Sequence, residues 1–330
     1  MAVSTLLSQR LGIDYPIIQA GMSWASSNVA LPAAVSNAGG LGVLAAGPMR
    51  PDDLRMALAQ LRDATDRPWG VNIPLYRKGV EEILDIVADA RPSVIIASQG
   101  APGSHLKRFH DLGSLWLHVT AFPRHAEKAA AQGVDGVIVV GTEAGGHPPD
   151  NGVSTLVAVR RILTLVDCPV IAGGGVADGY GIAALLALGA DAVQLGTRFL
   201  MTHEAGVHDN YKHAVAEAGI ADTVLAGRGN LPVRCVRNDF TASVLAAEAT
   251  GLPAADPERW AELLSGATLK QAALHGDVAM GKVEAGQSAG LIANIAPAAE
   301  VMGQLVREME AAMARLRSFT HPVPTRREFA

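Results

Sequence analysis

The sequence contains little cysteine, few aromatic residues and little charge. Its 330 residues include 2 cysteines, 4% aromatic residues and 18% charged residues. Cys168 and Cys235 show neither CxxC nor Cys/His spacing, so we predict two small buried thiols and no disulfide framework. The charged fraction lies below the roughly 25% of an average soluble domain. Together with 49% hydrophobic residues, it favours an α/β fold with much of its backbone buried.

Long runs of one residue class are also absent. The net charge is −5, and basic residues gather only in short pairs such as Arg160-Arg161. Nucleic acid and anionic membranes require a basic stripe, so neither is an expected partner. No uncharged apolar run approaches the roughly 20 residues of a membrane span, and the stretch from Met1 to Asp14 does not resemble a targeting segment. We therefore expect a cytoplasmic protein, either monomeric or homodimeric.

The sequence does contain regularly spaced apolar runs, which predict strands. Helical stretches lie between them, so strands and helices alternate and the sheet should be parallel. Eight such units favour a closed (β/α)8 TIM barrel over an open doubly wound sheet. No GxGxxG follows the first strand, which disfavours a Rossmann unit. The predicted strands are 16–20, 41–45, 69–73, 94–98, 115–119, 137–141, 169–173 and 192–196, and the predicted helices are 28–38, 51–63, 79–90, 104–112, 123–132, 154–166 and 178–188.

The alternation stops after Phe199, which predicts three regions. Residues 1–205 form the barrel, residues 206–294 form a smaller, mainly helical domain inserted after strand 8, and residues 295–330 return to the barrel. The inserted domain is expected to cover the substrate, with helices at 211–219, 239–250 and 257–264. A final helix over 297–317 should complete the barrel, with Met302, Met309 and Met313 as core residues.

His147 is the most informative single residue. It stands on a glycine-rich loop that follows the sixth predicted strand, and active sites of such barrels lie at the carboxyl ends of the strands. An imidazole can take or give a proton near neutral pH. We therefore predict that His147 is catalytic, the alternative being a loop histidine that caps backbone groups. The other histidines show no ligand spacing, and no carboxylate completes a metal triad, so no catalytic metal is expected.

The loops after strands 7 and 8 predict a phosphate site. Strand 7 ends in Gly173-Gly174-Gly175 before a helix begins at Asp178-Gly179, and strand 8 ends in Gly196-Thr197. Glycine lets backbone N–H groups approach phosphate closely, a helix N-terminus adds positive charge, and these two loops hold phosphate in many barrels. A tight turn is the alternative interpretation. A phosphate-bearing cofactor, FMN, is the working prediction.

Polar residues at other strand ends could bond a flavin ring. Asn72 follows strand 3, Gln99 follows strand 4, and His118 lies in strand 5, while Gly21-Met22 would present backbone N–H groups. Each has a plain alternative: a satisfied amide at the rim for Asn72 and Gln99, and a core histidine for His118.

Several of these motifs resemble the nitronate monooxygenase family, once called 2-nitropropane dioxygenases, and its relatives, the flavin-dependent type II enoyl-acyl-carrier-protein reductases. The resemblance covers nearly the whole chain. It implies FMN in a (β/α)8 barrel and His147 as the catalytic residue. The motifs are residues 19–24, 38–42, 68–72, 143–147, 172–179, 195–199, 275–278 and 285–291. The implied cofactor contacts are Ala20, Gly21, Met22, Asn72, Gly173, Gly174, Gly175, Gly196 and Thr197, and we predict Gln99, Glu143 and Gly145 as further cofactor contacts.

Two activities follow from the resemblance. A nitronate monooxygenase would oxidise alkyl nitronates with O2, with His147 contacting the nitro oxygens or removing the α-proton. A reductase would instead take electrons from NAD(P)H and reduce an enoyl thioester of acyl carrier protein or coenzyme A. Many of the monooxygenases have a lysine where Val119 stands and an acidic residue where Val140 stands, and the reductases also lack the lysine. A flavin-storing scaffold without activity is the third alternative.

Overall fold

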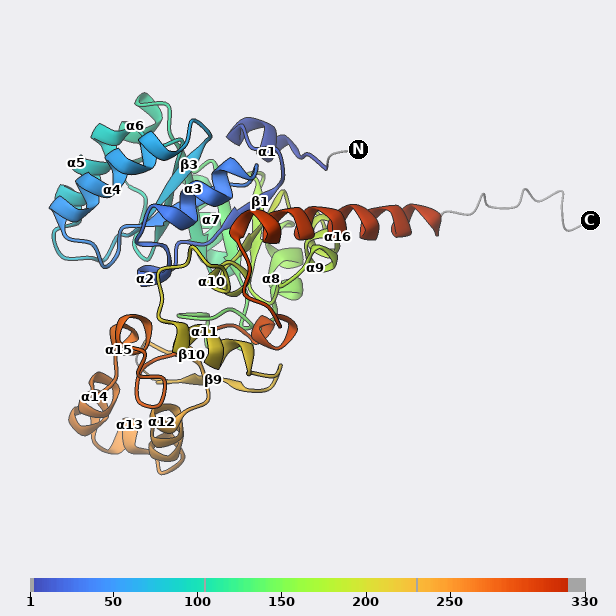
Figure 1. Cartoon of the computed structure of the whole chain (residues 1–330). Coiled ribbons are helices and arrows are strands. Elements are labelled where there is room, and N and C mark those ends of the chain that lie inside the picture. Colours follow the sequence, from blue (N-terminus) through green and yellow to red (C-terminus); the bar gives the residue numbers. More distant parts are fainter. Residues whose placement is uncertain (1–2, 104, 230, 320–330) are drawn as a thin grey trace, which may run out of the picture.

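The computed structural model describes residues 3–103, 105–229 and 231–319, and its central feature is a barrel of parallel strands (Figure 1). The strands are β1 (Ile17–Gln19), β2 (Gly42–Ala45), β3 (Trp69–Pro74), β4 (Val94–Ser98), β5 (Leu115–Thr120), β6 (Gly136–Val140), β7 (Val170–Gly173) and β8 (Ala192–Leu195). They pair in the order β1-β8-β7-β6-β5-β4-β3-β2. Ile18 of β1 also bridges to Leu41, next to β2, so the barrel is nearly closed. The predicted (β/α)8 TIM barrel is confirmed.

The strands are buried on both faces, as their unbroken apolar sequences require. Ile17 packs in the outer layer between sheet and helices, whereas its neighbour Ile18 lies in an inner cluster with Val43 and Ile96. Leu7 belongs to the same inner cluster and comes from α1 (Leu6–Leu11), which therefore covers one end of the barrel. The opposite end, where the strands have their carboxyl termini, is left for the site.

Helices surround the barrel. They are α2 (Ser23–Ser26), α3 (Ala30–Asn37), α4 (Pro51–Ala64), α5 (Val80–Ala90), α6 (His105–Asp111), α7 (Pro123–Ala131), α8 (Thr155–Ile162), α9 (Gly179–Leu188), α10 (Thr197–Leu200) and α16 (Ala298–Ser318). The long helix α16 packs against α9 and α3 and so takes the place of the eighth barrel helix. A Cβ on Gly179 would lie 2.2 Å from the Met309 nitrogen, so this packing requires glycine. Met302 and Met309 are fully buried core residues, as predicted.

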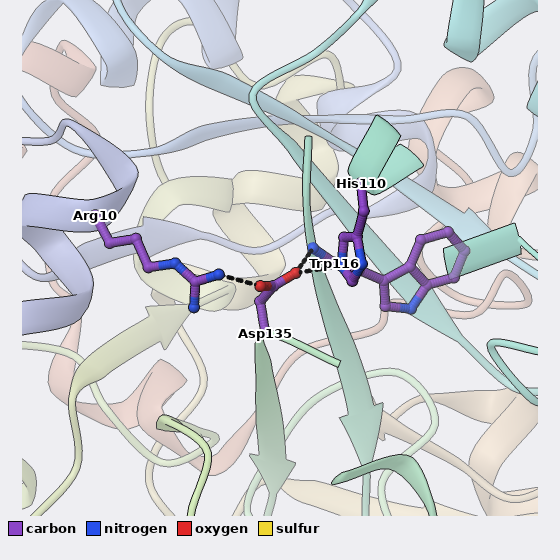
Figure 2. A network of polar contacts seen from close by, with 4 residues as sticks. All are labelled: Arg10, His110, Trp116 and Asp135. Carbon is purple, nitrogen blue, oxygen red and sulfur yellow. Dashed lines mark hydrogen bonds and ion pairs between the residues drawn. The ribbon is translucent and has the colours of Figure 1, made fainter. Parts of the chain in front are cut away.

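A polar network ties the barrel together at the amino-terminal ends of β5 and β6 (Figure 2). Asp135 directly precedes β6 and is buried. Its carboxylate accepts hydrogen bonds from the Trp116 N–H at 2.8 Å and from His110 Nε2 at 2.7 Å, and it forms an ion pair with Arg10. Residues at this face of a TIM barrel serve stability rather than chemistry. The network therefore fixes α1 and α6 to the sheet, away from the site.

The segment between α10 and α16 lies across the carboxyl-terminal end of the barrel (Figure 1). It contains α11 (Asp209–Ala216), β9 (Thr223–Ala226), β10 (Val233–Val236), α12 (Asp239–Ala249), α13 (Leu252–Ala255), α14 (Pro257–Ser265), α15 (Leu269–His275) and the short 3-10 helix η1 (Gln287–Leu291). The helices predicted at 239–250 and 257–264 match α12 and α14. The antiparallel hairpin of β9 and β10 was not predicted. The sequence-based division at residues 205 and 294 stays a prediction.

Candidate active site

A cavity of about 1520 Å³ opens at the carboxyl ends of the barrel strands. Barrel loops line one part of it, and the segment from α11 to η1 lines another part. His147 lies on its wall, together with every predicted cofactor contact except Glu143. The residues selected from sequence therefore converge on one space, although their positions extend from Ala20 to Thr197 in the sequence.

The turn after β1 is held by close packing. A Cβ on Gly21 would lie 2.3 Å from the Asn72 Cβ, so only glycine fits. The Asn72 amide donates to the Ile96 carbonyl at 3.0 Å. The Met22 N–H donates to Ser26 Oγ at 2.8 Å and the Ala20 N–H to the Leu195 carbonyl at 2.9 Å, so neither is free for a ligand. The Gly21 N–H meets no acceptor among the described residues, so the predicted contact between a backbone amide and a flavin ring is assigned to Gly21.

The loops after β7 and β8 form a cradle of backbone amides. Gly174 and Gly175 have φ of +100° and +75°, which L side chains rarely adopt. Among the residues that the structure describes, the amides of Gly174, Gly175, Gly196 and Thr197 donate no hydrogen bond. A Cβ on Gly196 would find its nearest neighbour, Met22 Sδ, at 3.5 Å, so space remains beside this residue. Free amides without side chains in front of them suit an anion such as phosphate.

The helix N-terminus expected to assist this cradle is already occupied. At the start of α9 the Gly181 N–H donates to Asp178 Oδ1 at 2.8 Å, and the Gly179 N–H donates to Glu308 Oε2 at 2.9 Å. These carboxylates satisfy the first amides of the helix. These two amides are therefore not available to a ligand, and the expected contribution of this helix end to an anion site stays a prediction.

Further polar groups line the cavity between these loops. His118 of β5 is 6% exposed, and its Nδ1 meets no hydrogen-bond partner. Burial lowers the pKa of His118, so its neutral form is favoured. Gln194 of β8 is 8% exposed and also lines the cavity. Gln194 was not predicted as a site residue, although a glutamine in an otherwise apolar strand is a usable signal. An unpartnered buried nitrogen here fits a bound heteroaromatic ring.

Gln99 lies on the cavity wall in a strained backbone conformation. Its φ is +52°, and its side chain is exposed. Non-glycine residues with positive φ are uncommon and gather at functional sites. The conformation agrees with a role at the rim for Gln99.

His147 is held in place by loop packing and by one hydrogen bond. A Cβ on Gly145 would lie 2.6 Å from the Ala285 carbonyl carbon, and Gly146 pairs with Arg234 of β10 through two backbone hydrogen bonds. His147 Nδ1 lies 2.9 Å from the Pro232 carbonyl oxygen. Because a carbonyl only accepts, Nδ1 carries the proton and Nε2 keeps the lone pair in the neutral ring. The covering segment thus sets the tautomer of the predicted catalytic residue.

Glu143 supports the loop rather than lining the cavity. Its carboxylate accepts from the Thr155 N–H at 2.9 Å and from the Thr155 hydroxyl at 3.0 Å. The Gln287 N–H donates to its carbonyl at 2.9 Å, which joins the loop to η1. Its predicted contact with a cofactor stays a prediction, and the observed bonds give it a positioning role.

Glu284 was not identified from the sequence, yet it lines the cavity beside His147. A Cβ on Gly146 would lie 3.3 Å from Glu284 Oε2. The Tyr211 hydroxyl donates to the Glu284 carbonyl oxygen at 2.8 Å and fixes the backbone there. Burial raises the pKa of the Glu284 carboxyl, while the positive charges of His147 and Lys282 act against this rise. Spatial proximity alone reveals this pair, because 137 positions separate the two residues in sequence.

Comparison with known proteins identifies the family. The family model described as nitronate monooxygenase matches residues 4–84 and 76–308. A nitronate monooxygenase of Paraburkholderia phytofirmans is 32% identical, over 94% of this chain and 96% of its own length. A dehydrogenase of Rhodococcus jostii named for an octahydro-indene-carboxyl-CoA is 37% identical, over 73% of this chain and 67% of its own. The structure of FabK from Thermotoga maritima superposes with a TM-score of 0.89 and 37% identity, covering 96% of this chain and 100% of that one.

The described part of the chain contains no helix long and apolar enough to cross a membrane. The family match spans both the barrel and the covering segment, including the His147 loop and the glycine cradle. The chain therefore belongs to the nitronate monooxygenase family of flavin-dependent oxidoreductases.

Proposed function

We propose that this protein is an FMN-dependent oxidoreductase that acts as a nitronate monooxygenase, oxidising alkyl nitronates with O2. The observation that carries the proposal is the arrangement of one cavity: a histidine with a fixed tautomer on one loop, and free glycine amides on the two following loops. One cavity would thereby contain both a histidine for proton transfer and a site that retains a phosphate group. The predicted cytoplasmic location and assembly stay predictions.

The residues of the cavity suit FMN. The amides of Gly174, Gly175, Gly196 and Thr197 would hold its phosphate, and Asn72, Gln99, His118 and Gln194 offer hydrogen-bonding groups to the edges of its ring. Val119 and Val140 line the cavity and would help to exclude water from a bound ring. When bound, FMN would accept electrons from one substrate and pass them to a second.

His147 supplies the proton chemistry in this proposal. Its Nδ1–H stays with the Pro232 carbonyl, so Nε2 accepts the α-proton of a nitroalkane. Once protonated, the same nitrogen donates to the nitronate oxygens and stabilises their charge. Glu284 lines the cavity beside this ring. The histidine therefore binds and orients the anion as well as moving its proton.

A second candidate is an NAD(P)H-dependent reductase of enoyl thioesters. The superposition on FabK, a type II enoyl-acyl-carrier-protein reductase, and the identity with a dehydrogenase of a CoA thioester favour it. Val119 also supports it, because many of the monooxygenases have a lysine at this position and the reductases, like this chain, do not. In this case His147 would face the thioester or the nicotinamide rather than a nitro group.

Anaerobic stopped-flow spectroscopy of the flavin-loaded protein separates the two. We expect an alkyl nitronate to bleach the flavin and oxygen uptake to follow when air is admitted, with NADH and NADPH reacting slowly. Rapid bleaching by NADH or NADPH, with no oxygen uptake on nitronate, would contradict the monooxygenase and support the reductase. Protein purified without flavin and unable to bind added FMN would contradict both.

A further inference from the structure

The cavity is far more positive than the protein that contains it. Among the described residues, five basic side chains line it against a single acidic one, Glu284. The whole chain, by contrast, has a net charge of −5. The basic residues are Arg77, Lys78, Lys128, Lys270 and Lys282. A concave surface of one sign attracts ligands of the other sign and raises their local concentration.

Two of these five cations are engaged by the protein itself. Arg77 donates to the Ala46 carbonyl at 2.6 Å and also to the Met49 carbonyl. Lys282 donates to the Leu264 carbonyl at 3.1 Å. These bonds fix Arg77 and Lys282 as parts of the wall.

The other three, Lys78, Lys128 and Lys270, are exposed and form no ion pair with any described residue. They come from three separate elements: the loop after β3, helix α7 and the first turn of α15. Their convergence on one cavity is therefore a product of the tertiary fold and not of a local run of charge. We call them the lysine wall.

Lys78 follows a strand on the opposite side of the barrel from the glycine cradle, and Lys128 follows a strand two places from β7. The cradle follows β7 and β8, whereas Lys78 follows β3 and Lys128 follows β5, and β3 and β7 are four strands apart in the closed order. The cavity of about 1520 Å³ also exceeds the ≈ 300–1,000 Å³ of an ordinary ligand pocket. A ligand on the cradle therefore leaves both space and positive charge at the lysine wall.

The three ammonium groups of the lysine wall indicate which class of ligand would bind there. Flexible ammonium groups on separate elements bind phosphate as point charges and tolerate some variation in its position. A small alkyl nitronate carries a single charge and cannot reach three lysines. Coenzyme A carries a diphosphate and a 3′-phosphate on a long flexible arm that ends in the reacting thioester. Such a ligand would meet the lysines with its phosphates and extend its arm toward His147.

We propose that Lys78, Lys128 and Lys270 form a subsite for the phosphates of a coenzyme A thioester substrate. The proposal rests on the second candidate function, reduction of an enoyl thioester, and on the glycine cradle being occupied by flavin phosphate, so that the second ligand must bind elsewhere. It names the substrate class for the thioester candidate and assigns a role to residues outside the catalytic loop.

The test measures binding to the flavin-loaded protein without turnover, by calorimetry with coenzyme A, 3′,5′-ADP and 2′,5′-ADP. The variants are K78Q, K128Q and K270Q, alone and combined. The matched control, R62Q/K107Q/R160Q, removes the same charge from outer helices α4, α6 and α8. Thermal melts verify folding, which exposed Lys→Gln changes should leave intact.

We expect coenzyme A to bind, with affinity falling as salt increases. Each single variant should weaken binding a few-fold, the triple variant by on the order of tenfold or more, and the control by less than twofold. Equal binding by the triple variant and the control would overturn the subsite. Tighter binding of 2′,5′-ADP than of 3′,5′-ADP would overturn the assignment to coenzyme A in favour of NADPH. Failure of the proposed function is read separately, from flavin content and flavin bleaching.

Discussion

The two walls of the cavity present opposite means of binding phosphate. The glycine cradle after β7 and β8 has no charge and offers rigid backbone amides that are fixed by the barrel itself. The lysine wall offers charges on exposed, flexible side chains from the loop after β3, from α7 and from α15. Rigid amides lose little entropy on binding and favour a group that stays, whereas exposed lysines give weak, salt-sensitive contacts that favour exchange. Two such walls would let one cavity retain a cofactor while a substrate binds and leaves.

The largest effect should come from the loop between the two walls. His147 follows β6, which lies between β5 and β7 in the barrel. We expect His147→Ala to reduce kcat by on the order of 10²-fold or more, because its proton transfer has no substitute. Flavin content should not change, since neither wall is altered. Steady-state kinetics with a nitronate, or with NAD(P)H and an enoyl thioester, measure the effect.

The control for this variant is His213→Ala on α11, which is exposed and outside the cavity. It should keep at least half of the activity. Turnover of H147A equal to that of the control would support a scaffold without chemistry at this histidine and contradict both enzymatic candidates.

An intermediate effect should come from filling the cradle. Gly196 has φ of −100°, which side chains tolerate, and a Cβ there has ordinary contacts only. Gly196→Val should therefore fold but block the approach of phosphate to the amides, weakening flavin retention by roughly tenfold or more. The flavin absorbance per protein after gel filtration measures this, with circular dichroism for the melting temperature. Gly303→Ala in α16, outside the cavity, is the control and should retain its flavin.

If Gly196→Val kept its flavin at normal affinity, the glycine amides would not be the phosphate site. The proposed difference between the two walls would then be lost, because phosphate would have to bind to the basic side chains of the cavity instead. The variant thus tests the cradle independently of the lysine wall.

Most of the barrel could be predicted from sequence, but only some helices of the covering segment could be. Every predicted strand is present. Buried parallel strands can be recognised in the sequence because they are short apolar runs that end at glycine or a polar residue. The hairpin of β9 and β10 was overlooked although Thr223 to Ala226 is a strand-like run followed by Gly227 and Gly229. This hairpin positions the His147 loop, since Pro232 accepts a hydrogen bond from His147 and Arg234 forms backbone hydrogen bonds with Gly146.

The residues of the candidate site divide in the same way. His147, Asn72 and the glycines follow strands and are recognisable by that position. Glu284 and the lysine wall have no local signature, because tertiary packing alone brings them to the cavity. Sequence position also cannot show that the first amides of α9 are used by Asp178 and Glu308.

The smallest effect should come from Glu284, on the edge of the cavity beside His147. Burial holds the pKa of its carboxyl above the ordinary 4.5. As pH rises past that value, the unfolded chain releases this proton before the folded protein does, so the free energy of unfolding falls until the folded-state pKa is passed. Glu284→Gln, which does not titrate, should melt a few degrees higher than the wild type near neutral pH and together with it below about pH 4.5.

Melting curves from acid to neutral pH measure this difference, and Glu217→Gln, an exposed carboxyl outside the cavity, is the control and should follow the wild type throughout. A melting difference for E284Q that stays constant with pH would mean that the change acts through packing and not through the buried charge. Loss of stability in E284Q at neutral pH would mean that attraction to His147 and Lys282 outweighs the cost of burial. Glu284 would then stabilise the folded protein through an ion pair, instead of destabilising it as an isolated buried carboxylate.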